Sequence, residues 1–179
     1  MRRFAGVMIL AGALVTNAAA SPGDLVQIVV PAGFEGPTSA DPGPGVHIDG
    51  YVRHIPGQER GTLLQITTYD FGSKLKDMPK EELADAAEHY LLQFLGGVER
   101  KRTGFHASKP TRVSLGKIPA ARVEWTGTAQ GEAMSGVMYC VIVGTTVVEF
   151  HTQGFRDSPP SDRVDALRAI ESVKFSAAG

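Results

Sequence analysis

Two pairs of histidine and carboxylate residues have the types and the spacing to do chemistry. His47 stands two residues before Asp49, and Glu149 stands two residues before His151. Because side chains two apart on a strand project from the same face, each pair could supply two metal ligands or an acid–base couple. Glu149 and His151 therefore form a candidate polar site, and His47 and Asp49 form a candidate metal site.

Neither pair completes a metal site by itself. A structural zinc ion needs four protein ligands, and a catalytic zinc ion needs three together with water. The sequence has no HExxH motif, no cysteine cluster and no histidine pair at helical spacing. The competing interpretation is a set of solvated histidines on the surface of a sheet, and we expect no resident cofactor.

Motifs for nucleophilic or nucleotide chemistry are also missing. Cys140 is the single cysteine, and its place in an alternating run favours a buried, unreactive thiol. Ser114 to Lys117 matches SxxK, but Gly116 and Pro119 favour a corner of the chain, and neither SDN nor KTG follows. GxSxG, GxGxxG and Walker A motifs are absent as well. These observations predict a protein without a catalytic centre.

A basic segment is the clearest surface signal. Residues 100–117 contain no acid and six basic side chains, which are Arg100, Lys101, Arg102, Lys109, Arg112 and Lys117. Such a segment could attract a small anionic ligand or an acidic partner surface. The alternative is a solvated loop that is balanced by the acidic helix preceding it.

A hairpin from Val137 to His151 is the most strongly specified local structure. Glycine at the first position of the Gly144–Thr145 loop is typical of a type II′ turn, which determines the register. One face then carries the pairs Val143–Thr146, Val141–Val148 and Tyr139–Phe150. The other face carries Ile142–Val147, Cys140–Glu149 and Met138–His151. The first face should be core, whereas the mixed second face could lie under a helix or form an interface.

Further strands are predicted on both sides of this hairpin. Alternation and turn residues place them at Leu25–Val30, Val46–His54, Thr62–Tyr69, Arg112–Leu115 and Ala121–Thr126. Ser39–Gly45 contains two prolines and two glycines and is therefore expected to be a loop. Val173–Phe175 is expected to return as a short extended tail.

Two helices are predicted as well. The first runs from Pro79 to Leu95, has an apolar stripe and should end at Gly96–Gly97. The second begins at Pro159–Pro160 and continues to about Ser172. Its apolar stripe is Val164, Leu167 and Ile170. Together these elements predict an α+β fold in which an antiparallel sheet of about six strands is flanked by helices.

The N-terminus predicts export. Arg2 and Arg3 precede an apolar run, and small residues end at Ala20, so residues 1–20 resemble a signal peptide. Cleavage leaves a single expected domain, residues 21–179, without a transmembrane anchor, and changes the net charge from −1 to −3 because both arginines are removed. The expected location is the periplasm or the medium, and the acidic balance argues against nucleic acid as a partner.

Four segments resemble the PsbP-like fold. They are VQIVVPAGF (Val26–Phe34), VSLGKIPAARVEWTG (Val113–Gly127), VIVGTTVVEFH (Val141–His151) and AIESVKF (Ala169–Phe175). This fold occurs in extrinsic proteins of photosystem II, a Ran-binding nuclear transport factor and DcrB-like bacterial envelope proteins. The resemblance implies a sheet sandwiched between helices and a small envelope protein, but no shared activity.

The leading hypothesis is thus a non-enzymatic binding or assembly domain of the bacterial envelope. Its partner would be an envelope protein or a small anionic ligand. The alternative is a small periplasmic enzyme or metal-binding protein that uses the sheet-face histidines and carboxylates. The sequence leaves the oligomeric state open.

Overall fold

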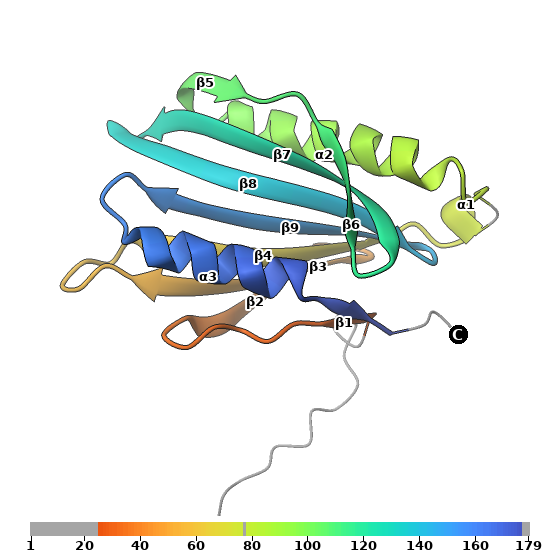
Figure 1. Cartoon of the computed structure of the whole chain (residues 1–179), viewed down its shortest axis with the longest axis horizontal. Coiled ribbons are helices and arrows are strands. Elements are labelled where there is room, and N and C mark those ends of the chain that lie inside the picture. Colours follow the sequence, from red (N-terminus) through yellow and green to blue (C-terminus); the bar gives the residue numbers. More distant parts are fainter. Residues whose placement is uncertain (1–24, 77, 177–179) are drawn as a thin grey trace, which may run out of the picture.

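A large antiparallel sheet with a helix against each face dominates the structure (Figure 1). The computed structural model describes residues 25–76 and 78–176. The predicted signal peptide, residues 1–20, lies outside these described residues. The α+β class and the antiparallel sheet between helices are confirmed.

The sheet has eight strands, more than the expected six or so. In spatial order, seven of them are β2 (Glu35–Gly43), β3 (Val46–His54), β4 (Gly61–Asp70), β9 (Thr146–Phe155), β8 (Glu132–Val143), β7 (Ile118–Ala129) and β5 (Thr103–Ala107). The eighth, β6 (Thr111–Leu115), also pairs with β7. A separate two-stranded pair joins β1 (Val26–Gln27) to β10 (Lys174–Phe175), which confirms the extended tail.

Two strands account for the difference from the expected number. β2 occupies most of the segment that was expected to be a loop, so that prediction was wrong. β2 is an edge strand with register shifts, and an edge tolerates proline because one side of the strand needs no ladder hydrogen bonds. β5 lies within the basic segment, whose polar composition carries no strand signal.

The predicted hairpin is confirmed pair for pair. β8 and β9 pair Val143 with Thr146 and continue in register to Met138 and His151. Gly144 has a φ of 59°, the left-handed conformation that a type II′ turn requires at its first central residue. Local turn chemistry therefore determines the pairing of the two central strands.

Each face of the hairpin belongs to a different core. The first face packs Tyr139, Val141 and Phe150 against α3 (Pro160–Glu171). The mixed face is covered by α2 (Leu83–Glu99), which buries Met138, Cys140, Ile142 and Val147. A helix, and not an interface, thus covers the part of the mixed face next to the turn (Figure 1).

Both ends of α2 differ from the prediction. The segment after Pro79 forms a turn, with Glu82 N donating to Pro79 O at 3.0 Å, and the helix begins at Leu83. Gly96 and Gly97 lie inside the helix instead of ending it. Val98 packs against the core below α2, so burial of this side chain outweighs the low helix propensity of glycine.

Replacement of Gly97 by alanine should raise the free energy of unfolding by about 0.5–1 kcal/mol. A Cβ at this position would approach only the Arg100 guanidinium, at an ordinary 3.8 Å. The gain comes from the smaller conformational freedom of alanine in the unfolded chain. Urea unfolding measures it, and a loss of stability would show that the backbone needs glycine here.

Candidate functional site

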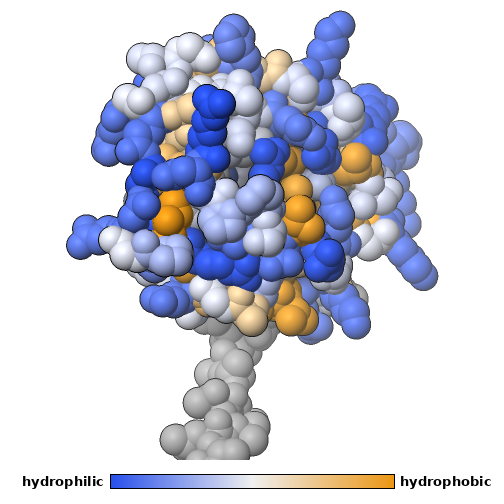
Figure 2. All heavy atoms as spheres, turned by 60° about the vertical axis from the view of Figure 1, so that its left-hand side comes forward, coloured by the Kyte–Doolittle hydropathy of each residue, from blue (hydrophilic) through white to orange (hydrophobic). Residues whose placement is uncertain are grey.

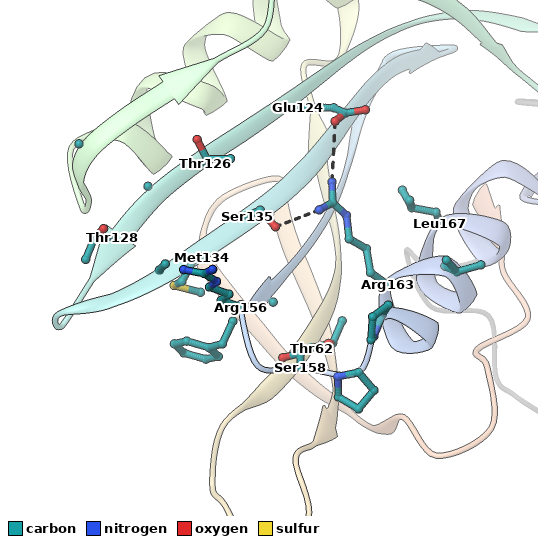
Figure 3. A pocket seen from close by; sticks show the side chains of 18 of the residues that line it. Thr62, Glu124, Thr126, Thr128, Met134, Ser135, Arg156, Ser158, Arg163 and Leu167 are labelled. Carbon is teal, nitrogen blue, oxygen red and sulfur yellow. Dashed lines mark hydrogen bonds and ion pairs between the residues drawn. The ribbon is translucent and has the colours of Figure 1, made fainter.

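A cleft between α3 and the paired strands β7 and β8 is the candidate site (Figure 3). Its volume is about 790 Å³, within the range of small-molecule sites. Among the residues that line it are Thr62, Arg122, Glu124, Met134, Ser135, Gly154, Phe155, Arg156, Ser158, Arg163, Val164 and Leu167. These residues come from four separate parts of the chain and combine charged with apolar side chains.

Arg163 reaches across the cleft from α3 to the sheet (Figure 3). Its Nη1 donates to Ser135 Oγ at 2.9 Å, while its Nη2 lies 3.9 Å from Glu124 Oε2. Arg122 holds the same carboxylate more closely, with Nη2 donating to Glu124 Oε1 at 2.6 Å. One acid is therefore shared by two guanidinium groups, and the contact of Arg163 is the looser one.

A hydrogen-bonded chain fixes the position of Arg122. Its Nε donates to the hydroxyl of Tyr139 at 3.0 Å, and that hydroxyl donates to Glu171 Oε1 on α3 at 2.9 Å. Burial, followed by the contact with Glu171, raises the pKa of Tyr139 against the opposing effect of Arg122. The neutral phenol thus links β7 to α3 at the end of the helix and keeps Arg122 beside Glu124.

The helix side of the cleft is apolar. Val164 and Leu167 were predicted to belong to the apolar stripe of this helix. Val164 is 50% exposed, and both side chains line the cleft. α3 instead packs on the sheet through Ala166, Ala169 and Ile170, whose small alanines allow close approach. Part of the predicted stripe therefore forms a wall of the cleft.

Arg156 lines the cleft from the loop that joins β9 to α3. Its side chain makes no hydrogen bond or ion pair with any described residue.

The end of the molecule that carries the β7–β8 turn has a mostly hydrophilic surface with separate hydrophobic patches (Figure 2). The cleft thus combines an unpaired cation with accessible apolar surface.

Sequence reasoning missed this cleft. Arg122, Glu124 and Thr126 were predicted to alternate with the apolar Ala121, Val123 and Trp125, and they do. A polar face on a strand next to a buried hairpin was the one signal available. It did not show that Arg163, which follows much later in the chain, approaches the same face.

Solved structures share this architecture. Cyanobacterial PsbP (CyanoP) from Synechocystis gives a TM-score of 0.61 at 11% sequence identity, and the match covers 93% of this chain and 99% of that one. The chain has a PsbP-like fold.

Two more solved structures can be compared with this PsbP-like fold. A protein from Bacteroides thetaiotaomicron gives a TM-score of 0.53 at 11% identity, over 89% of this chain and 48% of that chain. LpqN, involved in cell envelope biogenesis of Mycobacterium tuberculosis, gives a TM-score of 0.48 at 14% sequence identity. The match covers 84% of this chain and 83% of that chain. No protein-family model and no curated protein sequence matches the chain. At 11% identity, the likeness to cyanobacterial PsbP and to the Bacteroides protein shows the fold alone.

Glu149 and His151 lie under α2 in the PsbP-like sheet, with 4% and 6% of their surface exposed. Trp125 Nε1 donates to His151 Nε2 at 3.2 Å, so this nitrogen carries no proton. Burial, and then the charge of Arg102, lowers the pKa of His151 to about 3. Burial raises the pKa of Glu149 to about 8, partly opposed by a hydrogen bond from Thr67. Neither side chain lines the cleft.

The basic segment does not form one patch on the PsbP-like fold. The guanidinium of Arg102 stacks 4.2 Å from the ring centroid of Trp125 and donates to Val98 O and Gln153 Oε1 near the end of α2. Arg112 pairs with Asp85 near the start of the same helix. The remaining four, Arg100, Lys101, Lys109 and Lys117, are exposed. The six side chains therefore face different surroundings.

His47 and Asp49 share a face of β3, as their spacing predicted. His47 Nδ1 lies 2.7 Å from Asp41 Oδ1, and its Nε2 lies 3.2 Å from Asp49 Oδ1. Ser39 Oγ also donates to Asp49 at 2.6 Å. Both ring nitrogens are thus engaged by carboxylates. In residues 25–76 and 78–176, no group of three or more histidine, cysteine or acidic side chains is suited to hold a metal ion.

Protonation of His47 should stabilise the fold. The hydrogen bond to Asp41, opposed by burial and aided by Asp49, raises the pKa of His47 above 6.5. The folded state therefore retains this proton longer than the unfolded chain. The stabilisation is complete below about pH 6.5 and disappears as the pH rises through the raised pKa.

Urea unfolding of the native protein and His47→Gln, compared across this pH range, checks the prediction. The difference in stability between the two should be largest at acidic pH. Taking the difference cancels contributions from other titrating groups. His54→Gln, at an exposed position outside the cluster, is the matched control. An equal effect of both variants at every pH would contradict the prediction.

None of the helices in the described residues has the length and apolar character needed to span a bilayer.

Proposed function

We propose that the chain is an exported, non-enzymatic binding domain of the bacterial envelope, and that its cleft holds a small anionic amphiphile. The observation that carries the proposal is the juxtaposition, in one cavity of about 790 Å³, of the Arg156 and Arg163 guanidinium groups with an apolar helix face. A carboxylate or phosphate group complements the first, and an aliphatic body complements the second.

The charge balance of the cleft favours an anion. Glu124 is the single acid among its lining residues, against Arg122, Arg156 and Arg163. Arg122 is held by Glu124 and Tyr139, whereas Arg163 lies 3.9 Å from the shared carboxylate. Arg163 can therefore turn to a ligand by exchanging its hydrogen bond to Ser135 and its loose contact with Glu124. Arg156 has no side-chain partner among the described residues that a ligand would have to displace. Guanidinium groups match planar carboxylates with two parallel hydrogen bonds.

The apolar residues favour a ligand with a hydrophobic part. Val164, Leu167, Phe155 and Met134 line the cleft, and burial of their exposed surface by an aliphatic chain would be favourable by about 25 cal/mol per Å². A purely polar anion would leave this wall in water. The combination thus supports an amphiphile over inorganic phosphate.

Location in the envelope is part of the proposal. It rests on the charged, apolar and small-residue regions of residues 1–20, which are typical of a signal peptide. Fractionation of the native cells with an antibody against residues 21–179 tests the location directly.

Calorimetric titration with dodecanoate tests the binding. Arg156→Gln and Arg163→Gln should each weaken binding about tenfold, the effect of one charge-assisted contact. Arg112→Gln is the matched control, because Arg112 is exposed and pairs with Asp85 outside the cleft. Dodecanol, which lacks the charge, should bind more weakly. The absence of saturable binding, or an equal effect of all three variants, would refute the proposal.

A further inference from the structure

Two hydroxyl groups converge at one end of the cleft. Thr62 lies at the start of β4, Ser158 lies in the loop before α3, and Gly154 on β9 lies between them. A Cβ built on Gly154 would lie 3.1 Å from Thr62 Oγ1 and 3.4 Å from Ser158 Oγ. All three residues line the cavity. We call this place, formed by Thr62, Gly154 and Ser158, the hydroxyl seat.

The hydroxyl seat has unused hydrogen-bonding capacity. Thr62 is fully buried, and neither Thr62 Oγ1 nor Ser158 Oγ hydrogen-bonds to any described residue. Both oxygen atoms are inaccessible to bulk solvent. Buried hydroxyl groups nearly always have a partner, because leaving one without costs about as much as a lost hydrogen bond. Two such groups, both near Gly154 at one end of a cavity, point to a polar atom that belongs beside them.

Glycine makes room for that atom. Any larger residue at position 154 would place its Cβ within tight contact of the Thr62 hydroxyl. Gly154 does not have a positive φ, so the turn geometry of the backbone does not require glycine here. The absence of a side chain at position 154 therefore leaves space next to the two hydroxyl groups.

The hydroxyl seat lies away from the contact between Arg163 and Glu124. Figure 3 shows Thr62 and Ser158 at the opposite end of the cavity from Glu124 and the guanidinium group of Arg163. An anionic head would bind the guanidinium groups, because charge-assisted hydrogen bonds are about twice as strong as neutral ones. The hydroxyl seat is then left for a second, uncharged group. Val164 adds apolar surface to the lining of the same cavity.

We infer that the ligand is an amphiphile with two polar ends, an anionic head at the arginines and a hydroxyl or carbonyl oxygen at the hydroxyl seat. The inference rests on the proposed function and specifies its ligand class. A hydroxyl at the seat can donate to one side-chain oxygen and accept from the other. An ω-hydroxy acid is the simplest molecule with this chemistry.

Paired calorimetric titrations test the inference. The probes are dodecanoate and ω-hydroxydodecanoate, together with the equivalent pairs built on octanoate and hexadecanoate, so that the reach of the chain is sampled. The native protein should prefer the hydroxylated member by about tenfold for at least one length. Thr62→Val and Ser158→Ala should each abolish this preference. Gly154→Ala should abolish it by filling the seat.

The outcomes separate this inference from the proposed function. If plain and hydroxylated acids bind with equal affinity at every length, water fills the seat and the inference fails, while the proposed function stands. A preference that survives in both Thr62→Val and Ser158→Ala also overturns the inference. If no acid binds saturably, the proposed function fails first. Thr62→Val removes an unpaired buried hydroxyl at nearly constant volume, so it should fold at least as stably as the native chain.

Discussion

Replacement of Glu149 by glutamine should raise the free energy of unfolding by several kcal/mol at about pH 8 and change it little near pH 4.5. The carboxyl group is buried under α2, and its Oε1 has no hydrogen-bond partner among the described residues. Burial raises its pKa from 4.5 to about 8. Glutamine has nearly the same shape and never carries the charge that the site disfavours.

The direction of this pH dependence follows from the number of protons that the folded and the unfolded states bind. Between pH 4.5 and about 8, folded Glu149 keeps its proton while the unfolded chain has released it. Stability therefore falls as the pH rises across this window, by about 1.4 kcal/mol per pH unit. Below the window both states are protonated, and above it both are ionised. Glu149→Gln removes this dependence.

His151 acts in the opposite direction at lower pH. Its pKa falls from 6.5 to about 3 on folding, so the unfolded chain takes up a proton first on acidification. Its contribution to stability is complete above pH 6.5 and is lost as the pH falls toward 3. Between pH 4.5 and 6.5 the two dependences offset each other, so the native protein should be most stable there.

Urea unfolding at intervals of pH measures both effects. Glu149→Gln should reduce the loss of stability above pH 6.5 to the part expected from His47, and should leave the loss below pH 4.5 in place. His151→Gln is the companion variant, because its amide oxygen can still accept from Trp125 and only the acidic side should change. A native profile that does not fall between pH 6.5 and 8 would contradict the burial of a protonated Glu149.

Gly136→Ala should destabilise the fold by about 1–3 kcal/mol, as overpacked core positions do. Trp125 on β7 is paired with Gly136 on the neighbouring strand β8. A Cβ at position 136 would lie 2.5 Å from Trp125 Cε2. The indole cannot move aside freely, because Arg102 stacks on it and its Nε1 donates to His151. The added methyl group must therefore displace a buried ring.

Trp125 is the single tryptophan of the chain, so its fluorescence reports on this displacement. We expect Gly136→Ala to shift the emission to longer wavelength in the folded state and to lower the urea midpoint. Gly43→Ala is the matched control, since Gly43 also lies on a strand but a Cβ there meets nothing within 4 Å. An unchanged spectrum together with unchanged stability would show that the ring has room to move.

Glu149→Gln and Gly136→Ala change residues on the face of the sheet that α2 covers. The proposed ligand binds on the face that α3 covers. The polar groups under α2 are tied to one another: Trp125 donates to His151 and supports Arg102. The cleft, in contrast, contains an unpaired arginine and two unpaired hydroxyl groups. Binding therefore has more physical support beside α3 than at the polar pair under α2.

Local patterns predicted a large part of the fold. The strand Val46–His54, the register of the β8–β9 hairpin and the start of α3 agree with the structure because each depends on neighbouring residues. A glycine at a turn, alternation along a strand and proline at a helix start act over a few positions. The resemblance to the PsbP-like fold came from the same local features.

Contacts between distant segments decided the rest. Ser39–Gly45 looks like a loop by composition, yet most of it pairs along the edge of β3. Glu149 and His151 alternate as predicted, but α2 buries them and moves their pKa values in opposite directions. The cleft and the hydroxyl seat join β4, β7, β8, β9 and α3, which only the packing of the helix on the sheet brings together. No spacing in the sequence predicts that these segments lie together. Their proximity depends on how closely Ala166 and Ala169 allow α3 to approach the sheet.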